Sequence, residues 1–310
     1  MTAIRDRNVL ITGGASGLGL GFAHALASLG ARIIIADSSV ENGQAAERQL
    51  KDQNHKATFV NVDVTSAASV ASMIKAALAW VPGGEAIDAA ILSAGVNGNP
   101  FDLSPEDPSA LSTPEAWQAV ERNAKTLNVN LTAVLQCVQL VVKYGMGLPT
   151  SQSQSAPTSA KASVKSITLI GSLASYRALP RAVDYSASKW GVRGAFRSLR
   201  QQLPKIGVRI NMIAPGFVKT PLLAHTIPMY EQIGVHFVEE ADVVEATVKV
   251  VSDVTCSGRA FAVGSQGALE LHDEAGGMDA STAVNELLEK GVFGTPSCPM
   301  GRDEQTVHFQ

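Results

Sequence analysis

The chain has 310 residues, of which 45% are hydrophobic and 17% charged, and its formal net charge at pH 7 is −3. The length fits one large α/β domain with a sizeable core, and the net charge argues against a nucleic-acid partner, which would need a basic surface. Cys137, Cys256 and Cys298 lack metal-ligand spacing and are too few for a disulfide framework, so we predict no metal site and a reducing, cytoplasmic compartment.

The first predicted unit is a strand, a glycine-rich turn and a helix. The strand covers residues 8–11, which leaves no room for a signal peptide ahead of it, and no apolar run in the chain is long enough to predict a membrane span. The turn places Gly13, Gly17 and Gly19 in the spacing G-x-x-x-G-x-G rather than the commoner G-x-G-x-x-G. Such glycines let the backbone approach a pyrophosphate, whose charge a helix N-terminus favours. We therefore predict a dinucleotide-binding loop.

Asp37 ends the second predicted strand, residues 32–36. A carboxylate at this place would accept hydrogen bonds from both ribose hydroxyls of an adenosine. It would repel a 2′-phosphate, and the glycine loop holds no Arg or Lys to offset that repulsion. NAD is therefore favoured over NADP. The alternative is that Asp37 caps the helix that begins near Glu41.

The third and fourth predicted strands each end in polar or small residues. Asp63 follows the strand over 58–62, and it either faces an adenine or caps a helix over 66–80. Ser93-Ala94-Gly95 follows the strand over 89–92. Its small side chains would let a nicotinamide ribose approach the backbone.

A long helix is predicted over residues 113–144, after an unusually long connection over 97–113. It is apolar on more than one side and carries Asn130 in its middle, where Asn is unfavourable without a reason. Such a helix would also pack on a partner subunit. Together with the helix over 184–203 it predicts a homodimer or homotetramer. Residues 147–163 are low in complexity and predict a mobile surface insertion.

The fifth predicted strand leads to Ser172, and the next helix carries Tyr185 and Lys189. Residues i and i+4 of a helix share one face. An ammonium beside a phenol lowers the pKa of the phenol from about 10 towards neutral pH. Such a phenol can take a proton from an alcohol or give one to a carbonyl, while Ser172 holds the same oxygen. The alternative is a solvated surface pair.

The last elements are a strand over 209–214, a turn over 215–220, a helix over 239–251, a strand over 260–263 and a tail over 271–310 with a short helix near 282–290. Residues 221–238 are apolar and irregular, which fits a lid over an apolar substrate but also ordinary packing. Strands alternate with helices and no linker separates two cores. We therefore predict one α/β domain over residues 1–270, with a parallel sheet and right-handed crossovers.

Six motifs occur together in this chain: TGGASGLG, SAG, Asn130, Ser172, YSASK and PGFVKT. In this order and spacing they resemble the short-chain dehydrogenases/reductases over residues 7 to about 265. The resemblance implies a doubly wound, Rossmann-like fold, with helices on both faces of a seven-stranded sheet of order 3-2-1-4-5-6-7. It also implies a tetrad in which Tyr185 is the acid/base, Ser172 orients the substrate oxygen, Lys189 binds the nicotinamide ribose and Asn130 holds a water in a proton relay.

The resemblance also completes the set of predicted cofactor contacts. They are Thr12, Gly13, Ser16, Gly17, Leu18, Gly19, Asp37, Asp63, Val64, Ser93, Ala94, Gly95, Tyr185, Lys189, Pro215, Gly216, Val218 and Thr220. One departure is Ser93, which stands where the family usually has Asn and could alter the support of its turn. The loops over 97–113 and 147–163 and the tail are longer than usual, and these parts would shape a substrate pocket.

We expect an NAD-dependent oxidoreductase that interconverts a secondary alcohol and a ketone on a hydrophobic small molecule. The chain is loosely similar to NAD-dependent dehydrogenases of hydrophobic alcohols, including those of fungal secondary metabolism. Alternatives are an NADPH-dependent ketoreductase, an isomerase that uses bound NAD, and a catalytically silent NAD-binding module. A silent module has no chemical need for the tetrad. Substrate identity, stereochemistry and physiological direction are not fixed by the sequence.

Overall fold

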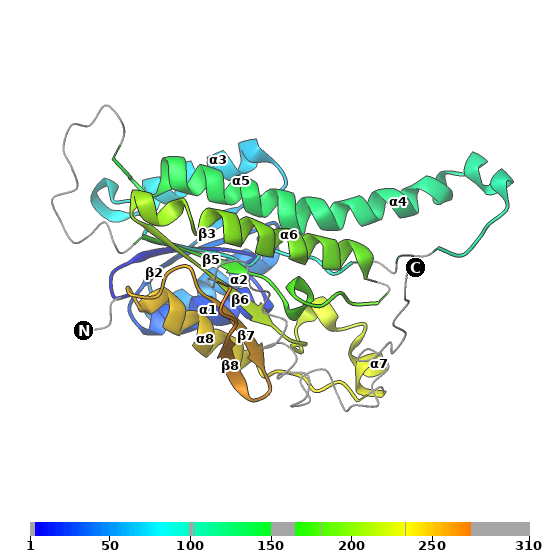
Figure 1. Cartoon of the computed structure of the whole chain (residues 1–310). Coiled ribbons are helices and arrows are strands. Elements are labelled where there is room, and N and C mark those ends of the chain that lie inside the picture. Colours follow the sequence, from blue (N-terminus) through cyan, green and yellow to red (C-terminus); the bar gives the residue numbers. More distant parts are fainter. Residues whose placement is uncertain are drawn as a thin grey trace.

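The computed structural model describes residues 4–98, 101, 103–149, 165–180, 182–232 and 234–273. Within them, one sheet of order β3-β2-β1-β4-β5-β6-β7-β8 lies between two layers of helices (Figure 1). The strands are β1 (Asn8–Thr12), β2 (Arg32–Asp37), β3 (Ala57–Asn61), β4 (Ala89–Leu92), β5 (Lys165–Ile170), β6 (Val208–Pro215), β7 (Ala260–Gly264) and β8 (Gly267–Glu270). The helices are α1 (Gly17–Ser28), α2 (Val40–Asp52), α3 (Ala67–Trp80), α4 (Pro114–Leu127), α5 (Ala133–Leu140), α6 (Val183–Leu199), α7 (Ile227–Gln232) and α8 (Glu240–Ser252). The doubly wound fold and the predicted order of the first seven strands are confirmed.

The sheet has an eighth strand beyond the seven predicted. β8 runs antiparallel to β7, with Gly267 opposite Gly264 and Glu270 opposite Phe261. Gly267 has a φ of +99°, a conformation that glycine adopts without steric cost and that lets the chain reverse in a tight hairpin. Four residues of mixed polarity are too few to show a strand period in the sequence. Pairing with β7 decides the conformation of this segment.

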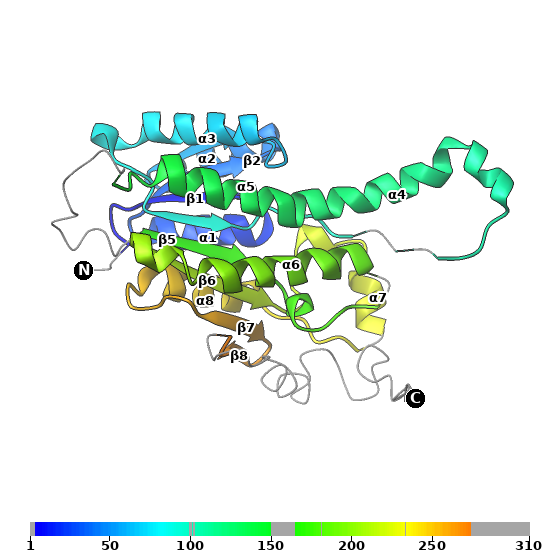
Figure 2. The ribbon, with the colours of Figure 1, turned by 45° about the horizontal axis from the view of Figure 1, so that its top comes forward.

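Each face of the sheet has its own apolar core. Side chains of α3, α5 and α6 pack on one face, and those of α1, α2 and α8 pack on the other. Figure 2 shows α3, α5 and α6 lying side by side over the sheet. All five residues of β1 are buried, as expected for a strand covered on both faces. No helix within the described ranges is long and apolar enough to span a membrane.

Serine side chains fix the starts of two helices. Ser39 accepts a backbone N–H from the first turn of α2, and Ser66 does the same for α3. Asp37 is therefore not the cap of α2, and Asp63 is not the cap of α3. Both alternatives of the sequence analysis are wrong, and the two carboxylates are available for other partners.

The predicted long helix runs from Pro114 to Gly145, but two π-helical segments interrupt it, Asn128–Thr132 and Val141–Gly145. The first contains Asn130, and such insertions are frequent at functional sites. Helix α4, the first part of this long helix, projects beyond the sheet (Figure 2).

The predicted helix over 184–203 ends earlier, at Leu199, and a 3-10 helix, Leu203–Ile206, follows. Pro204 has no N–H to donate to a helical hydrogen bond, which explains why the helix ends before residue 203. Of the predicted insertion over 147–163, only residues 147–149 belong to the described part of the chain. The short helix expected near 282–290 lies outside the described residues.

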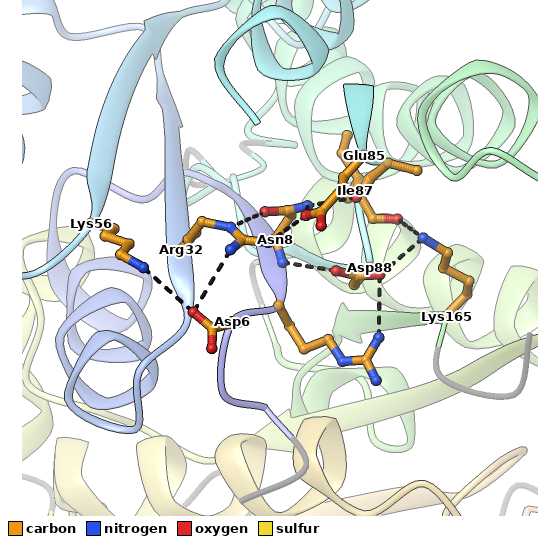
Figure 3. A network of polar contacts seen from close by, with 10 residues as sticks. Asp6, Asn8, Arg32, Lys56, Glu85, Ile87, Asp88 and Lys165 are labelled. Carbon is orange, nitrogen blue, oxygen red and sulfur yellow. Dashed lines mark hydrogen bonds and ion pairs between the residues drawn. The ribbon is translucent and has the colours of Figure 1, made fainter. Parts of the chain in front are cut away.

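A polar network closes the edge of the sheet where the parallel strands begin (Figure 3). Arg32 donates to Asn8 Oδ1 at 2.6 Å and pairs with Glu85 at 2.5 Å. Asp88 accepts the backbone N–H of Asn8 at 2.9 Å and pairs with Lys165 at 3.0 Å. These contacts join the first residues of β1, β2 and β5 to the residues that precede β4. The opposite edge, where the strands end, carries the candidate site.

Candidate active site

A cavity of about 700 Å³ lies at the carboxyl ends of the parallel strands. Ligands of open α/β sheets bind at this edge. Most of the predicted site residues line it: Gly13, Ser16, Gly17, Leu18, Gly19, Asp37, Asp63, Val64, Ser93, Ala94, Gly95, Ser172, Tyr185, Lys189, Pro215, Gly216, Val218 and Thr220. Thr12 and Asn130 are the predicted residues that do not reach the wall.

The glycine turn is packed so closely that side chains would not fit. Gly13 has a φ of +65°, and a Cβ on it would lie 2.8 Å from Ala94 Cα. A Cβ on Gly19 would lie 2.1 Å from Gly13 O. Ser16 is the N-cap of α1, yet its side chain makes no capping hydrogen bond. The first turn of α1 therefore opens on the cavity with the backbone amides that favour an anion.

Thr12 and Ser93 hold the glycine turn from behind. Ser93 Oγ donates to Thr12 O at 2.5 Å, and the backbone N–H of Ala94 donates to Thr12 Oγ1 at 3.2 Å. Thr12 is buried behind the cavity wall rather than in it. Ser93, which departs from the family pattern, thus ties the turn after β4 to the end of β1.

Asp37 is held at the edge of the cavity by two backbone amides. Its Oδ2 accepts the N–H of Ala15 at 3.1 Å, and its Oδ1 accepts the N–H of Ser39 at 3.0 Å. Among the described residues, the basic side chains of the cavity wall are Lys125 and Lys189. Neither belongs to the glycine turn or to the residues that follow Asp37.

Asp63 is a second carboxylate in the wall. Thr65 donates to it through its hydroxyl at 2.7 Å and its backbone N–H at 2.9 Å, and these hydrogen bonds hold the pKa of Asp63 below its usual value. The charge of Lys125, on α4, acts in the same direction. Lys125 and its neighbour Glu121 line the cavity but were not predicted. With Asn128 they recur at i, i+4 and i+7, a polar stripe that the sequence does contain.

Ser172, Tyr185 and Lys189 come together in the same wall. Ser172 follows β5 and caps a 3-10 helix, whereas Tyr185 and Lys189 belong to the first two turns of α6. Lys189 Nζ lies 5.7 Å from the centroid of the Tyr185 ring and donates to Ile170 O, at the end of β5, at 3.0 Å. Lys189 is buried, so the alternative of a solvated surface pair is wrong.

The pKa values of Tyr185 and Lys189 are set mainly by burial. Burial raises the pKa of Tyr185, and a hydrogen bond with the Ser172 side chain offsets only part of the increase. Burial lowers the pKa of Lys189 to about 8. The Tyr–Lys spacing predicts instead that the ammonium lowers the pKa of Tyr185. For the chain by itself the direction is the opposite, because burial is the largest effect on the Tyr185 phenol and favours its protonated form.

Asn130 lies behind the cavity wall and supports it by hydrogen bonds to Val96. Its Oδ1 accepts the N–H of Val96 at 2.8 Å, and its Nδ2 donates to Val96 O at 2.9 Å. The side chain is fully buried. It therefore fixes the segment after β4, whose Val96 and Asn97 line the cavity. The water that the resemblance assigns to Asn130 stays a prediction.

The wall beyond Tyr185 is mostly apolar and includes part of the predicted lid. The contributing residues are Leu179, Ala182, Phe217, Leu222, Leu223 and Tyr230. The ring centroids of Phe217 and Tyr230 lie 4.6 Å apart, and Lys219 pairs with Glu231 at 2.6 Å. These contacts tie α7 to the segment after β6. Leu222, Leu223 and Tyr230 thus face the cavity, which favours the lid interpretation, while Ile233 lies outside the described residues.

Known proteins share both the motifs and the fold. A family model described as short chain dehydrogenase matches residues 7–231. A 5'-hydroxyaverantin dehydrogenase from Dothistroma septosporum is 32% identical over 286 residues, which cover 88% of this chain and 89% of the relative. An NADP-dependent dehydrogenase M3 from a Phoma species is 29% identical, over 94% of this chain and 86% of the relative. The crystal structure of levodione reductase has a TM-score of 0.68 at 23% identity, over 88% of this chain and 100% of that one.

Proposed function

Because the chain belongs to the short-chain dehydrogenase family, we propose that it is an NAD-dependent oxidoreductase interconverting a secondary alcohol and a ketone. The main support for the proposal is one observation. Ser172, Tyr185 and Lys189 lie in the wall of the same cavity as the glycine turn. A phenol, a hydroxyl and an ammonium at one place suit proton transfer at a C–O bond.

The residues of the cavity fit a nicotinamide dinucleotide. The glycine turn leaves room for backbone approach, the first turn of α1 suits a pyrophosphate, and the Asp37 carboxylate suits a ribose diol. The Ser93–Gly95 turn and the segment of residues 215–220 would hold the nicotinamide half. The cofactor, when bound, supplies the hydride acceptor or donor.

The chain's own residues would manage the proton. In the oxidation direction Tyr185 takes the proton of the substrate hydroxyl, and Ser172 donates a hydrogen bond to the same oxygen. Lys189 holds the end of β5 through Ile170 O, and its remaining N–H groups would donate to a nicotinamide ribose. Because burial raises the pKa of Tyr185, the positive charge of the oxidised cofactor has to favour the phenolate.

The apolar wall supports a hydrophobic substrate. The lid contributes Leu222, Leu223 and Tyr230 to the wall of the cavity that also holds Ser172, Tyr185 and Lys189. One relative is named as a dehydrogenase of 5'-hydroxyaverantin. We therefore place this chain among enzymes that act on hydroxylated hydrophobic molecules of secondary metabolism.

A second candidate is an NADPH-dependent ketoreductase, since one relative is named as NADP-dependent. Asp37 argues against it, because a 2′-phosphate beside this carboxylate would meet like charge. The test is turnover of tetralol and cyclohexanol, two secondary alcohols, with NAD and with NADP. We expect the wild type to prefer NAD by about a hundredfold or more.

Asp37→Ala should reduce the preference for NAD by weakening NAD binding and removing the repulsion of a 2′-phosphate. Glu41→Ala is the matched control, since it removes the same charge from α2 outside the cavity wall. The ratio of kcat/KM with NAD to kcat/KM with NADP is the measured quantity. Equal ratios in the wild type and in Asp37→Ala would rule out the role of Asp37.

The same turnover assay with secondary alcohols also distinguishes a dehydrogenase from a silent NAD-binding module and from an isomerase. A silent module binds NAD, as seen by calorimetry, but reduces none with any alcohol. An isomerase converts its substrate with no net NADH. Steady accumulation of NADH that is lost in Tyr185→Phe supports the dehydrogenase.

A further inference from the structure

Asp273, just beyond β8, is buried against the two segments that carry Ser172 and Tyr185. It is fully buried, and it lies beyond residue 231, where the family match ends. Leu271 N donates to Ala260 O at 2.8 Å, which fixes this stretch against the start of β7. The first residues of the predicted tail are therefore packed into the domain.

One side of the Asp273 carboxylate is held by α6. Arg193 Nη2 donates to Asp273 Oδ1 at 2.8 Å, and Arg193 Nε lies 3.2 Å from the same oxygen. The Arg193 side chain is 5% exposed. Tyr185, Lys189 and Arg193 follow one another at intervals of four residues on α6, so they lie along one side of the helix.

The other side of the carboxylate is held by the turn that begins at Ser172. Tyr176 donates its hydroxyl to Asp273 Oδ2, and the Arg193 guanidinium lies 4.2 Å from the centroid of the Tyr176 ring. Burial, and then the charge of Asp273, raise the pKa of Tyr176, so this phenol stays a donor. Ser175 N donates to Ser172 O at 2.8 Å, which makes the turn one unit. Ser172 and Tyr176 therefore belong to one hydrogen-bonded turn.

A buried ion pair is a weak source of net stability, because both charges lose their hydration. Its use is to fix one placement of the groups that it joins. We propose that Asp273 is a positioning residue that locks the Ser172 turn to α6, so that Ser172 and Tyr185 reach the same substrate oxygen. The catalytic part of this inference rests on the proposed function, whereas the mechanical link does not.

The test compares hydrogen–deuterium exchange in the full-length wild type, Asp273→Asn and Glu270→Gln. Glu270 is the matched control, because this carboxylate at the end of β8 pairs with Arg259, just before β7, rather than with Arg193 or Tyr176. We expect Asp273→Asn to speed exchange about tenfold in both residues 172–177 and residues 183–193, and Glu270→Gln to leave both segments unchanged. Turnover of tetralol should fall about tenfold to a hundredfold in Asp273→Asn, with the Kd for NAD changed less than about threefold, because the adenosine half is held elsewhere.

Wild-type exchange in both segments of Asp273→Asn, or equal acceleration in Glu270→Gln, would overturn the proposal. Tyr176→Phe decides the case if Asp273→Asn does not fold, since it keeps the buried ring and removes one hydrogen bond. It should speed exchange in residues 172–177 and leave α6 unchanged, and no change in either segment counts against the link. If the wild type oxidises no alcohol, the proposed function fails while the exchange data still decide the link.

Discussion

At the scale of single residues, Lys189 connects helix α6 to the end of strand β5 in the cavity wall. Its ammonium lies at the base of the cavity, bonded to the last carbonyl of β5, while its backbone belongs to α6. Tyr185, one turn earlier, is left with a pKa that burial raises. In the proposed mechanism the phenolate of Tyr185 is therefore not preformed, and the charge of a bound oxidised nicotinamide would favour it.

Tyr185→Phe should lower the turnover of a secondary alcohol by about a hundredfold or more, because it removes the proton acceptor and keeps the ring. NAD affinity, measured by calorimetry, should stay near that of the wild type. Tyr144→Phe is the control, since Tyr144 is exposed and outside the cavity wall. Near-normal turnover in Tyr185→Phe would remove the centre of the mechanism.

Lys189 should make stability depend on pH in a defined window. Its pKa is about 8 in the folded chain, against 10.5 for an ordinary lysine, so between these values the unfolded state binds more protons. The free energy of unfolding contributed by Lys189 therefore rises with pH from 8 to 10.5, by at most about 1.4 kcal/mol per unit, and is constant below that window.

Urea unfolding from pH 7 to pH 10 gives the free energy of unfolding of the wild type and of Lys189→Met. The difference between the two values measures the contribution of Lys189, because the titration of the tyrosines is common to both proteins. The stability of the wild type relative to Lys189→Met should increase above pH 8. A difference that is independent of pH would mean that Lys189 titrates as an ordinary lysine.

At the scale of elements, the segment between β6 and α8 forms an apolar part of the cavity wall. The 3-10 helix Pro221–Leu223 and helix α7 are short and bring apolar side chains to the cavity. The Phe217–Tyr230 contact and the Lys219–Glu231 pair attach them to the segment after β6. Because the apolar side chains Leu222, Leu223 and Tyr230 belong to these short elements, substrate preference should change most through this segment.

Tyr230→Leu should raise the KM for tetralol by about twofold to tenfold while kcat changes little. The reason is that the substitution removes an aromatic contact, of about 0.5–1.5 kcal/mol, from the substrate side of the wall and leaves the proton carrier in place. Initial rates over a range of tetralol concentrations separate the two constants. The exposed Tyr144→Leu is the control, and an unchanged KM in Tyr230→Leu would place the substrate elsewhere.

At the scale of the whole molecule, helices α4 and α6 form part of the outer surface on one side of the sheet. They lie side by side in both views (Figures 1 and 2). Large apolar side chains are exposed on α4, α5 and α6, among them Trp117, Val120, Leu135 and Trp190. Exposed side chains of this kind gathered on neighbouring helices are typical of an interface between copies of a chain.

We therefore expect a homodimer or homotetramer in which the long helix from Pro114 to Gly145, which includes α4 and α5, and helix α6 pair with their own copies. Light scattering at micromolar concentration should give a multiple of 32.4 kDa. Leu135→Glu should shift the mass towards the monomer, because it places a charge in the apolar interface. Val254→Glu adds the same charge at an exposed position after α8 and should not. A particle of 32.4 kDa in the wild type would contradict the assembly.

The sequence by itself determined the order of the strands up to β7 and predicted about half of the residues that line the cavity. Continuous apolar strands, glycines in the spacing G-x-x-x-G-x-G, and a Tyr and a Lys one helical turn apart are local patterns. Parallel strands then bring the residues after each strand to one edge of the sheet. For this reason Gly13, Asp37, Ser172, Tyr185 and Lys189 could be assigned before the fold was known.

The tertiary structure alone decided the electrostatics and the long-range contacts. The pKa values of Tyr185 and Lys189 follow from burial, which the spacing of the two residues does not express. Strand β8 forms because β7 offers it an edge, and Thr12 lies behind the wall because Ala94 packs against it. Asp273 meets Arg193 across 80 positions of sequence, a pairing that no local pattern contains because it depends on the path of the folded chain.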